Sequence, residues 1–140
     1  MSGSSSHIFV LEDNPADLYM IKYSIRQAGV ACEFTAFADG AEAMKFVKAD
    51  ASPVPDLMIL DGNVPGIEGA AVLDTVRSNR RWLRVGVFMF TGSRNPEDVA
   101  LAGKLGADRY LLKPMDVAGF ERIGQIVRAW LEGKSYEKTR

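Results

Sequence analysis

The sequence predicts an α/β protein with a doubly wound, five-stranded parallel sheet, and three observations support this fold class. Strand-like apolar runs alternate five times with segments in which apolar residues recur at helical spacing. The runs at residues 8–11 and 57–60 are apolar throughout, which is typical of strands buried on both faces. The length of 140 residues suits one domain with one core. Right-handed crossovers then favour the strand order 2-1-3-4-5.

The expected elements follow one another in strict alternation. The five strands are expected at residues 8–11, 32–37, 57–60, 85–90 and 110–112. The first and fourth helices begin at Pro15 and Pro96, because each proline follows an asparagine that can cap the helix. Gly29 and Gly106 end these two helices. The second helix is expected after Asp39-Gly40, and the third over residues 68–79. The fifth contains Phe120, Ile123, Val127 and Trp130.

Composition and charge argue against several classes of protein. With 17 basic and 18 acidic residues the net charge is −1, which gives no electrostatic reason to expect a nucleic-acid partner. No apolar stretch approaches the ~20 residues that span a bilayer, so no membrane partner is expected. The single cysteine, Cys32, rules out an internal disulfide and suits a reducing compartment. We therefore expect a cytoplasmic protein, in which the only histidine, His7, has no catalytic role.

The domain boundaries are expected near the ends of the sequence. Residues 1–6 are expected to form a flexible leader, which lacks the basic and apolar regions of a secretory signal. Residues 7–132 would form the domain. Residues 133–140 would be a short C-terminal tail that either extends the last helix or frays, and no output domain is expected.

Polar residues follow four of the five expected strands. Glu12 and Asp13 follow the first strand, Asp61 the third, Thr91 the fourth and Lys113 the fifth. Ligands of open α/β sheets bind at the carboxyl ends of the strands, at a switch point that here lies between strands one and three. A plain alternative is that chains simply turn polar at strand ends. That alternative explains any one of these residues, but not three acids, a hydroxyl and a lysine together.

Three carboxylates at one edge of the sheet need a compensating charge. At about 5 Å they repel by roughly 3 kcal/mol per pair at an effective dielectric of about 20. Either one carboxylate is protonated or a cation lies among them. A few carboxylates completed by water is the arrangement that Mg²⁺ favours. A carboxylate beside a divalent ion, a lysine and a hydroxyl has the groups that phosphoryl transfer requires.

Four segments in particular resemble a known family. "FVLEDNPAD", "DLMILDGNVPG", "FMFTGS" and "YLLKP" resemble, in order and spacing, the motifs of the receiver domain of bacterial two-component response regulators. The resemblance covers about residues 7–130 and implies a flavodoxin-like (β/α)5 fold. It also implies a single-domain response regulator of the chemotaxis-regulator kind, and "EDNPAD" with Asn63 resembles receivers paired with phytochrome-type sensor kinases. The implied partners are a sensor histidine kinase or phosphotransfer protein, and a downstream protein target or a second copy of the chain.

The resemblance also implies a role for each residue of the acidic edge. Asp61 would take a phosphoryl group from a kinase phosphohistidine and lose it slowly, so the chain would be a phospho-acceptor and not a conventional enzyme. Asp13 would hold Mg²⁺ directly and Glu12 directly or through water, together with Asp61 and the backbone carbonyl of Asn63. Lys113 would pair with Asp61 or with the phosphoryl oxygens.

The same resemblance implies a switch that connects the acidic edge to a distant face. The Thr91 hydroxyl would move to bond the phosphoryl group, and Tyr110 would turn inward behind it. The expected docking or dimer face lies on the fourth helix, fifth strand and fifth helix, and bears Lys104, Arg109, Tyr110 and Val117. Thr91 as a plain strand-end residue, Tyr110 as a fixed aromatic and the face as ordinary solvated surface remain the alternatives.

Two further expectations concern the backbone near the site. Members of the family usually have a cis bond at the lysine-proline pair, so a cis bond is expected at Lys113-Pro114. The family usually has a bulky apolar residue after the phosphorylated aspartate, whereas this chain has Gly62. Glycine loosens this loop, which affects the expected metal affinity and phosphoryl lifetime. Asn63 and Ser93 occupy positions that tune self-dephosphorylation in relatives.

Three other functions are alternatives to this one. A receiver-like docking module that is never phosphorylated is the main alternative. A flavodoxin-like electron carrier shares the architecture, but the acids of "LEDNPAD" would repel the phosphate of its cofactor. A haloacid-type phosphatase generally needs a second aspartate two residues after its nucleophile, where this chain has Asn63.

Overall fold

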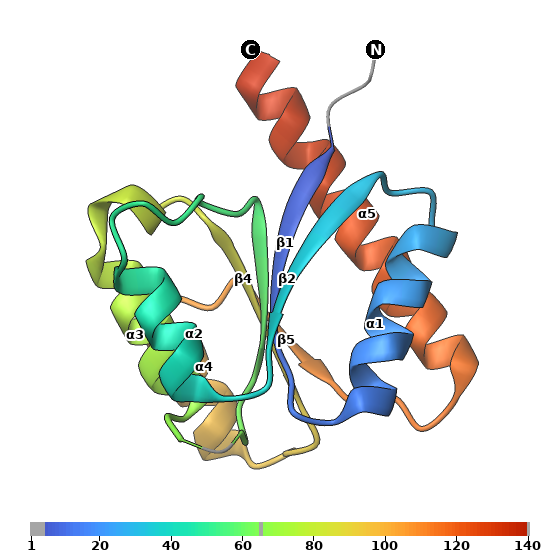
Figure 1. The fold of residues 1–140 in the computed structure, drawn as a ribbon. Helices are drawn as coiled ribbons and strands as arrows, with labels where there is room; N and C mark the ends of the chain where they lie inside the picture. The colour runs from blue at the N-terminus through green and yellow to red at the C-terminus, as the bar shows by residue number, and fades with distance from the viewer. Residues whose placement is uncertain (1–4, 65, 140) are drawn as a thin grey trace.

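A computed structural model describes residues 5–64 and 66–139 of the chain, and in it strands and helices alternate as expected (Figure 1). The strands are β1 (Ser6–Leu11), β2 (Cys32–Phe37), β3 (Leu57–Asp61), β4 (Gly86–Thr91) and β5 (Arg109–Leu112). The helices are α1 (Pro15–Gln27), α2 (Gly40–Lys48), α3 (Gly69–Ser78), the 3₁₀ turn η1 (Arg80–Trp82), α4 (Pro96–Leu105) and α5 (Val117–Thr139). Only η1 has no counterpart among the expected elements.

The five strands form one parallel sheet with helices on both faces. Their order is β2-β1-β3-β4-β5, and every neighbouring pair is parallel, which confirms the predicted fold class and strand order. Helices α2, α3 and α4 cover one face of the sheet, and α1 and α5 cover the other (Figure 1). The central strands β1, β3 and β4 are therefore covered on both sides, which explains their continuous apolar sequences.

Alternate residues of the strands supply two separate cores. Phe9 and Leu11 of β1 belong to the cluster under α2, α3 and α4, whereas Ile8 and Val10 belong to the cluster under α1 and α5. All four side chains are fully buried. Because side chains of a strand point alternately to opposite faces, a run with no polar residue is required to fill both cores.

The helix ends follow the sequence signals that predicted them. The Asn14 side chain accepts hydrogen bonds from the amides of Ala16 and Asp17, and the Asn95 side chain accepts one from the amide of Glu97. Gly106 ends α4 in the left-handed conformation, at φ 100°. The two asparagine caps determine where α1 and α4 begin, and so where the loops that follow β1 and β4 end.

The ends of the chain differ in part from the expected boundaries. β1 begins at Ser6, the last residue of the expected leader, and residues 1–4 lie outside the described part of the chain. The backbone of α5 continues to Thr139, so the expected tail extends the last helix. None of the helices in the described residues has the length and apolar character needed to cross a bilayer.

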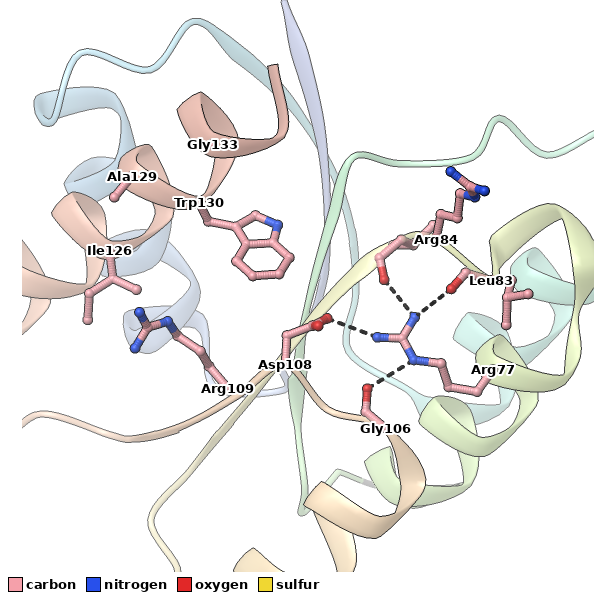
Figure 2. Close-up of a pocket in the computed structure, with 11 residues that line it drawn as sticks. Arg77, Leu83, Arg84, Gly106, Asp108, Arg109, Ile126, Ala129, Trp130 and Gly133 are labelled. Carbon is pink, nitrogen blue, oxygen red and sulfur yellow. Dashed lines mark hydrogen bonds and ion pairs between the residues drawn. The ribbon is translucent and has the colours of Figure 1, made fainter. Parts of the chain in front are cut away.

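A hollow of about 670 Å³ lies at the edge of the sheet opposite the acidic one, where β4 and β5 begin (Figure 2). Arg77, at the end of α3, forms part of its wall. Its guanidinium donates hydrogen bonds to the carbonyls of Leu83, Val85 and Gly106, and pairs with the Asp108 carboxylate at 2.9 Å. One side chain thus joins the turn before β4 to the turn before β5.

Candidate functional site

The carboxyl ends of four strands bring the predicted polar residues to one edge. Glu12 and Asp13 follow β1, Asp61 ends β3, Thr91 ends β4 and Lys113 follows β5. In the ladder between β3 and β4, Asp61 lies opposite the residue that precedes Thr91. Glu12, Asp61 and Thr91 are buried, while Asp13 is exposed. The structure therefore brings together the residues that the sequence predicted.

Lys113 is the positive centre of this edge. Its Nζ lies 2.9 Å from Oδ2 of Asp61, 3.1 Å from Oδ2 of Asp17, and 3.0 and 3.1 Å from the two carboxylate oxygens of Glu12. Burial alone would lower the pKa of Lys113, but the hydrogen bonds to Asp61, Glu12 and Asp17 outweigh burial and raise it. The ammonium therefore stays charged and compensates three carboxylates at once.

Asp17 is a member of the site to which the sequence analysis gave no role. It lies in the first turn of α1, where its amide donates to the Asn14 cap and its carboxylate reaches Lys113. No local signal marked this role, because Asp13 precedes α1 and so does not share a helical face with Asp17. Asp17 therefore extends the acidic edge from the sheet onto α1.

Glu12 is buried, and the Lys113 ammonium lies close to both of its carboxylate oxygens. Oε2 accepts hydrogen bonds from the amide of Asn14 at 3.0 Å and from Lys113 at 3.1 Å. Oε1 is buried and lies 3.0 Å from the Lys113 ammonium, but accepts no hydrogen bond from the described residues. Burial, opposed by those two hydrogen bonds and reinforced by the neighbouring Asp61, raises the pKa of Glu12 from 4.5 to about 7. A proton on Glu12, or a further cation beside Oε1, would offset the cost of burying this carboxylate.

The acidic residues of this edge fit a divalent cation. Glu12, Asp13 and Asp61 each offer one oxygen, and these oxygens lie within 4.8 Å of one another. Hard oxygen donors with room for water are the set that Mg²⁺ prefers, and Oε1 of Glu12, which accepts no hydrogen bond from the described residues, is one such donor. Asn63 lies beside the cluster, because its amide donates to Oδ1 of Asp61 at 2.9 Å. Its carbonyl as a metal ligand stays a prediction.

Thr91 and Tyr110 are connected through Ser93. The Thr91 hydroxyl oxygen accepts from the amide of Ser93 at 3.2 Å, and the Tyr110 hydroxyl donates to the Ser93 carbonyl at 3.0 Å. Tyr110 is half-buried against the core under α2, α3 and α4. Both side chains thus hold the loop between β4 and α4, although their predicted role as a switch stays a prediction.

The prediction of a cis bond at Lys113-Pro114 was wrong. The described residues contain no cis peptide bond. The Lys113 amide still donates to the Thr91 carbonyl at 2.9 Å, which continues the pairing of β5 with β4 by one residue. Since a trans bond is preferred by about 0.5–1 kcal/mol before proline, and the ammonium reaches all three carboxylates in this geometry, nothing here requires the cis form.

Gly69 is a second residue that the sequence analysis did not single out. A Cβ at this position would clash with the backbone carbonyl of Asp61. Because Gly69 is the first residue of α3, the helix can begin directly against the end of β3. This close approach places the loop of Gly62 and Asn63 between the acidic edge and α3.

Comparison with known proteins gives a consistent result. The chain matches the family model of the response regulator receiver domain over residues 8–124. It is 30% identical over 130 residues to the response regulator Rcp1 of Synechocystis sp., a match that covers 89% of this chain and 88% of Rcp1. It also matches longer curated regulators, of which it spans 48% and 24% in two cases.

Solved structures are similar over nearly the whole chain. The phosphorylated cyanobacterial phytochrome response regulator RcpA superposes with a TM-score of 0.84 at 26% identity, covering 94% of this chain and 96% of that one. The Mn²⁺-bound form of Rcp1 has a TM-score of 0.81 at 29% identity, covering 91% and 95%. The receiver domain of the sensor histidine kinase PA1611 of Pseudomonas aeruginosa, with a magnesium ion in its active-site cleft, has 0.72 at 25% identity, covering 92% and 99%.

Proposed function

Because the chain belongs to the response regulator receiver domain family, we propose that it accepts a phosphoryl group on Asp61 in a Mg²⁺-dependent reaction. The donor is the phosphohistidine of a sensor histidine kinase or phosphotransfer protein. The observation that carries this proposal is the Asp61 carboxylate, which is buried, 2.9 Å from the Lys113 ammonium, and within 4.8 Å of oxygens of two further acids. Similarity to a phytochrome response regulator supports a phytochrome-type sensor kinase as the donor.

In this reaction an oxygen of Asp61 attacks the phosphorus atom while the bond from phosphorus to the histidine nitrogen breaks. Glu12, Asp13 and Asp61 would hold the Mg²⁺ ion, which when bound supplies positive charge to the phosphoryl oxygens. Lys113 supplies a second, fixed positive charge from the end of β5. Asn63 orients Asp61 through the hydrogen bond from its amide.

Phosphorylation would change the loop that Thr91 and Tyr110 hold. If the Thr91 hydroxyl turns toward the phosphoryl group, its hydrogen bond with the Ser93 amide is lost, and the loop that leads to α4 is released. Tyr110, bonded to the carbonyl of the same Ser93, then changes its position as well. The proposed docking face on α4, β5 and α5 would bind a downstream protein or a second copy of the chain through residues that include Lys104, Arg109, Tyr110 and Val117.

The test is acceptance of phosphate from acetyl phosphate with Mg²⁺. The intact mass of the wild type should increase by one phosphoryl group, and the adduct should be absent in Asp61→Asn. Asp50→Asn, at an exposed aspartate after α2, is the matched control and should be labelled like the wild type. A wild type that takes no phosphoryl group would contradict the proposal and favour a docking module that works without phosphorylation.

A further inference from the structure

Gly62, the residue after Asp61, is a glycine that the fold does not require. Its backbone is not in the left-handed region, since the glycines with positive φ are Gly29, Gly66 and Gly106 within the described residues. A Cβ at Gly62 would lie 3.7 Å from the Thr91 hydroxyl oxygen and 3.9 Å from the Met89 methyl, which are ordinary contact distances. Neither conformation nor space excludes a side chain here, unlike at Gly69.

A cavity of about 160 Å³ lies where that side chain would be. We call it the Gly62 cavity. It is lined by Gly62 and Asn63 from the loop after β3, by Thr91 and Ser93 from the end of β4, and by Tyr110 of β5, with apolar side chains of α3 and α4 behind them. A cavity needs only about 10–15 Å³ to hold one water molecule, so this one has room for several.

The wall nearest Asp61 is polar enough to retain water. Ser93 donates its hydroxyl hydrogen bond to the Asp98 carboxylate at 2.6 Å, and Tyr110 donates to the Ser93 carbonyl. The oxygens of Thr91, Ser93 and Tyr110 keep lone pairs toward which water can donate. A water molecule in a cavity needs two to four polar partners, and this wall supplies them.

Neighbours of the predicted phosphorylation site line the Gly62 cavity. Gly62 follows Asp61 in the chain. Asp61 lies opposite Phe90 in the ladder between β3 and β4, and the next residue of β4, Thr91, lines the cavity. Asn63 also lines the cavity, and its amide donates a hydrogen bond to Oδ1 of Asp61. Asp61 itself does not line the cavity, so Gly62, Asn63 and Thr91 separate the two, and Gly62 is the one of these three without a side chain.

We propose that the Gly62 cavity holds the water that hydrolyses phosphorylated Asp61, and that the absence of a side chain at position 62 shortens the phosphoryl lifetime. This inference rests on the proposed function. In the step, a water oxygen bonds to phosphorus while the bond from phosphorus to the Asp61 oxygen breaks. Asp61 leaves as a carboxylate, and both protons of the water end on the released dihydrogen phosphate. Gly62 acts here as a positioning residue, because it admits the water without contacting the phosphoryl group.

The experiment compares phosphoryl lifetimes after removal of acetyl phosphate. Gly62→Leu should lengthen the lifetime about tenfold, a change in activation free energy of about 1.4 kcal/mol, because the leucine fills the cavity with apolar atoms. Gly62→Ala, which adds only the Cβ, should lengthen it about twofold to threefold. Gly103→Leu is the matched control. Gly103 is exposed on α4, and a Cβ added there would meet nothing within 4 Å. The phosphoryl lifetime of Gly103→Leu should therefore equal that of the wild type.

Two further measurements separate this role from a structural one. After denaturation, the phosphoryl group should be lost at the same rate from all variants, because the cavity no longer exists. The unfolding midpoint of Gly62→Leu should be equal to or higher than that of the wild type, since the leucine fills a void. If Gly62→Leu does not fold, Gly62→Ala alone decides.

The outcomes distinguish this inference from the proposed function. A wild type that takes no phosphoryl group contradicts the proposed function. If the wild type is labelled and the phosphoryl lifetime of both Gly62 variants equals that of the wild type, the inference is wrong but the proposed function stands. Folded Gly62 variants that accept no phosphoryl group overturn it as well, because position 62 would then govern acceptance and not hydrolysis.

Discussion

Replacing Arg77 by methionine should lower the free energy of unfolding by about 2–3 kcal/mol, although Arg77 lies at the edge of the sheet opposite Asp61. The substitution keeps the apolar part of the side chain and removes the guanidinium. That group donates to three backbone carbonyls and pairs with Asp108, as Figure 2 shows. Without the guanidinium, no Arg77 hydrogen bond joins the turn before β4 to the turn before β5.

The magnitude follows from the number of bonds and their exposure. At about 0.5–1.5 kcal/mol net per hydrogen bond, four bonds contribute about 2–6 kcal/mol. The side chains of Arg77 and Asp108 are 19% and 31% exposed, so water can replace part of what is lost. The lower end of the range is therefore expected. Arg77→Lys should recover less than half, because an ammonium cannot present the fork of donors that reaches all four acceptors.

The assay is equilibrium unfolding in urea, followed by tryptophan fluorescence from Trp82 and Trp130. Arg80→Met is the matched control, because Arg80 is exposed in η1 and should change stability by less than about 0.5 kcal/mol. Equal stabilities of Arg77→Met and Arg80→Met would refute the reasoning. Labelling by acetyl phosphate should be retained in Arg77→Met, since no contact of Arg77 reaches the acidic edge.

Three further predictions concern the acidic edge and a glycine of β4. Lys113→Met should cost about 3 kcal/mol of stability in chelator at pH 8, because buried carboxylates lose their cation, and added Mg²⁺ should restore part of this in urea unfolding. For Glu12 the raised pKa means that the folded protein binds a proton more tightly than the unfolded chain. Stability in chelator should therefore rise by about 2 kcal/mol as the pH falls from 8 to 5.5, and this rise should be absent in Glu12→Gln. Gly86→Ala should cost about 1–3 kcal/mol in the same assay, because its Cβ would clash with the Trp130 indole.

Each of these predictions has a control or a contrary result. Gly103→Ala, where a Cβ meets nothing within 4 Å, should not destabilise the protein as Gly86→Ala does. Identical pH profiles for the wild type and Glu12→Gln would show that Glu12 does not titrate between the two states. A Lys113→Met protein as stable as the wild type in chelator would mean that its carboxylates are not held together by this lysine.

The sheet and the positions of the acidic residues were predictable for physical reasons. A strand buried on both faces must be apolar throughout, so Ile8–Leu11 and Leu57–Leu60 were recognisable in the sequence. Parallel strands end at one edge, so the first polar residue after each strand had to meet the others there. Asp61 and Lys113 were found by this argument although 52 positions separate them.

Other features depend on contacts that leave no local signal. Three of the four acceptors of Arg77 are backbone carbonyls, which every residue has, so nothing in the sequence indicates them. Asp17 belongs to the site only because the Lys113 side chain extends far enough to reach α1. The bond at Lys113-Pro114 is trans, whereas the resemblance implied a cis bond, and the Lys113 ammonium reaches Asp61 with the trans bond. The empty space beside Gly62 requires the positions of three strands and two helices at once.

The contact between Lys113 and Glu12 joins residues 101 positions apart, and it forms only when the last strand has docked onto β4. An assembly intermediate without β5 would have the nucleophilic aspartate but no ammonium beside it. Reactivity toward a small phosphate donor is therefore a chemical reporter of completed assembly. Pulses of acetyl phosphate during renaturation would measure the fraction of molecules in which β5 has docked. Circular dichroism, in contrast, would already record most of the helices before that step.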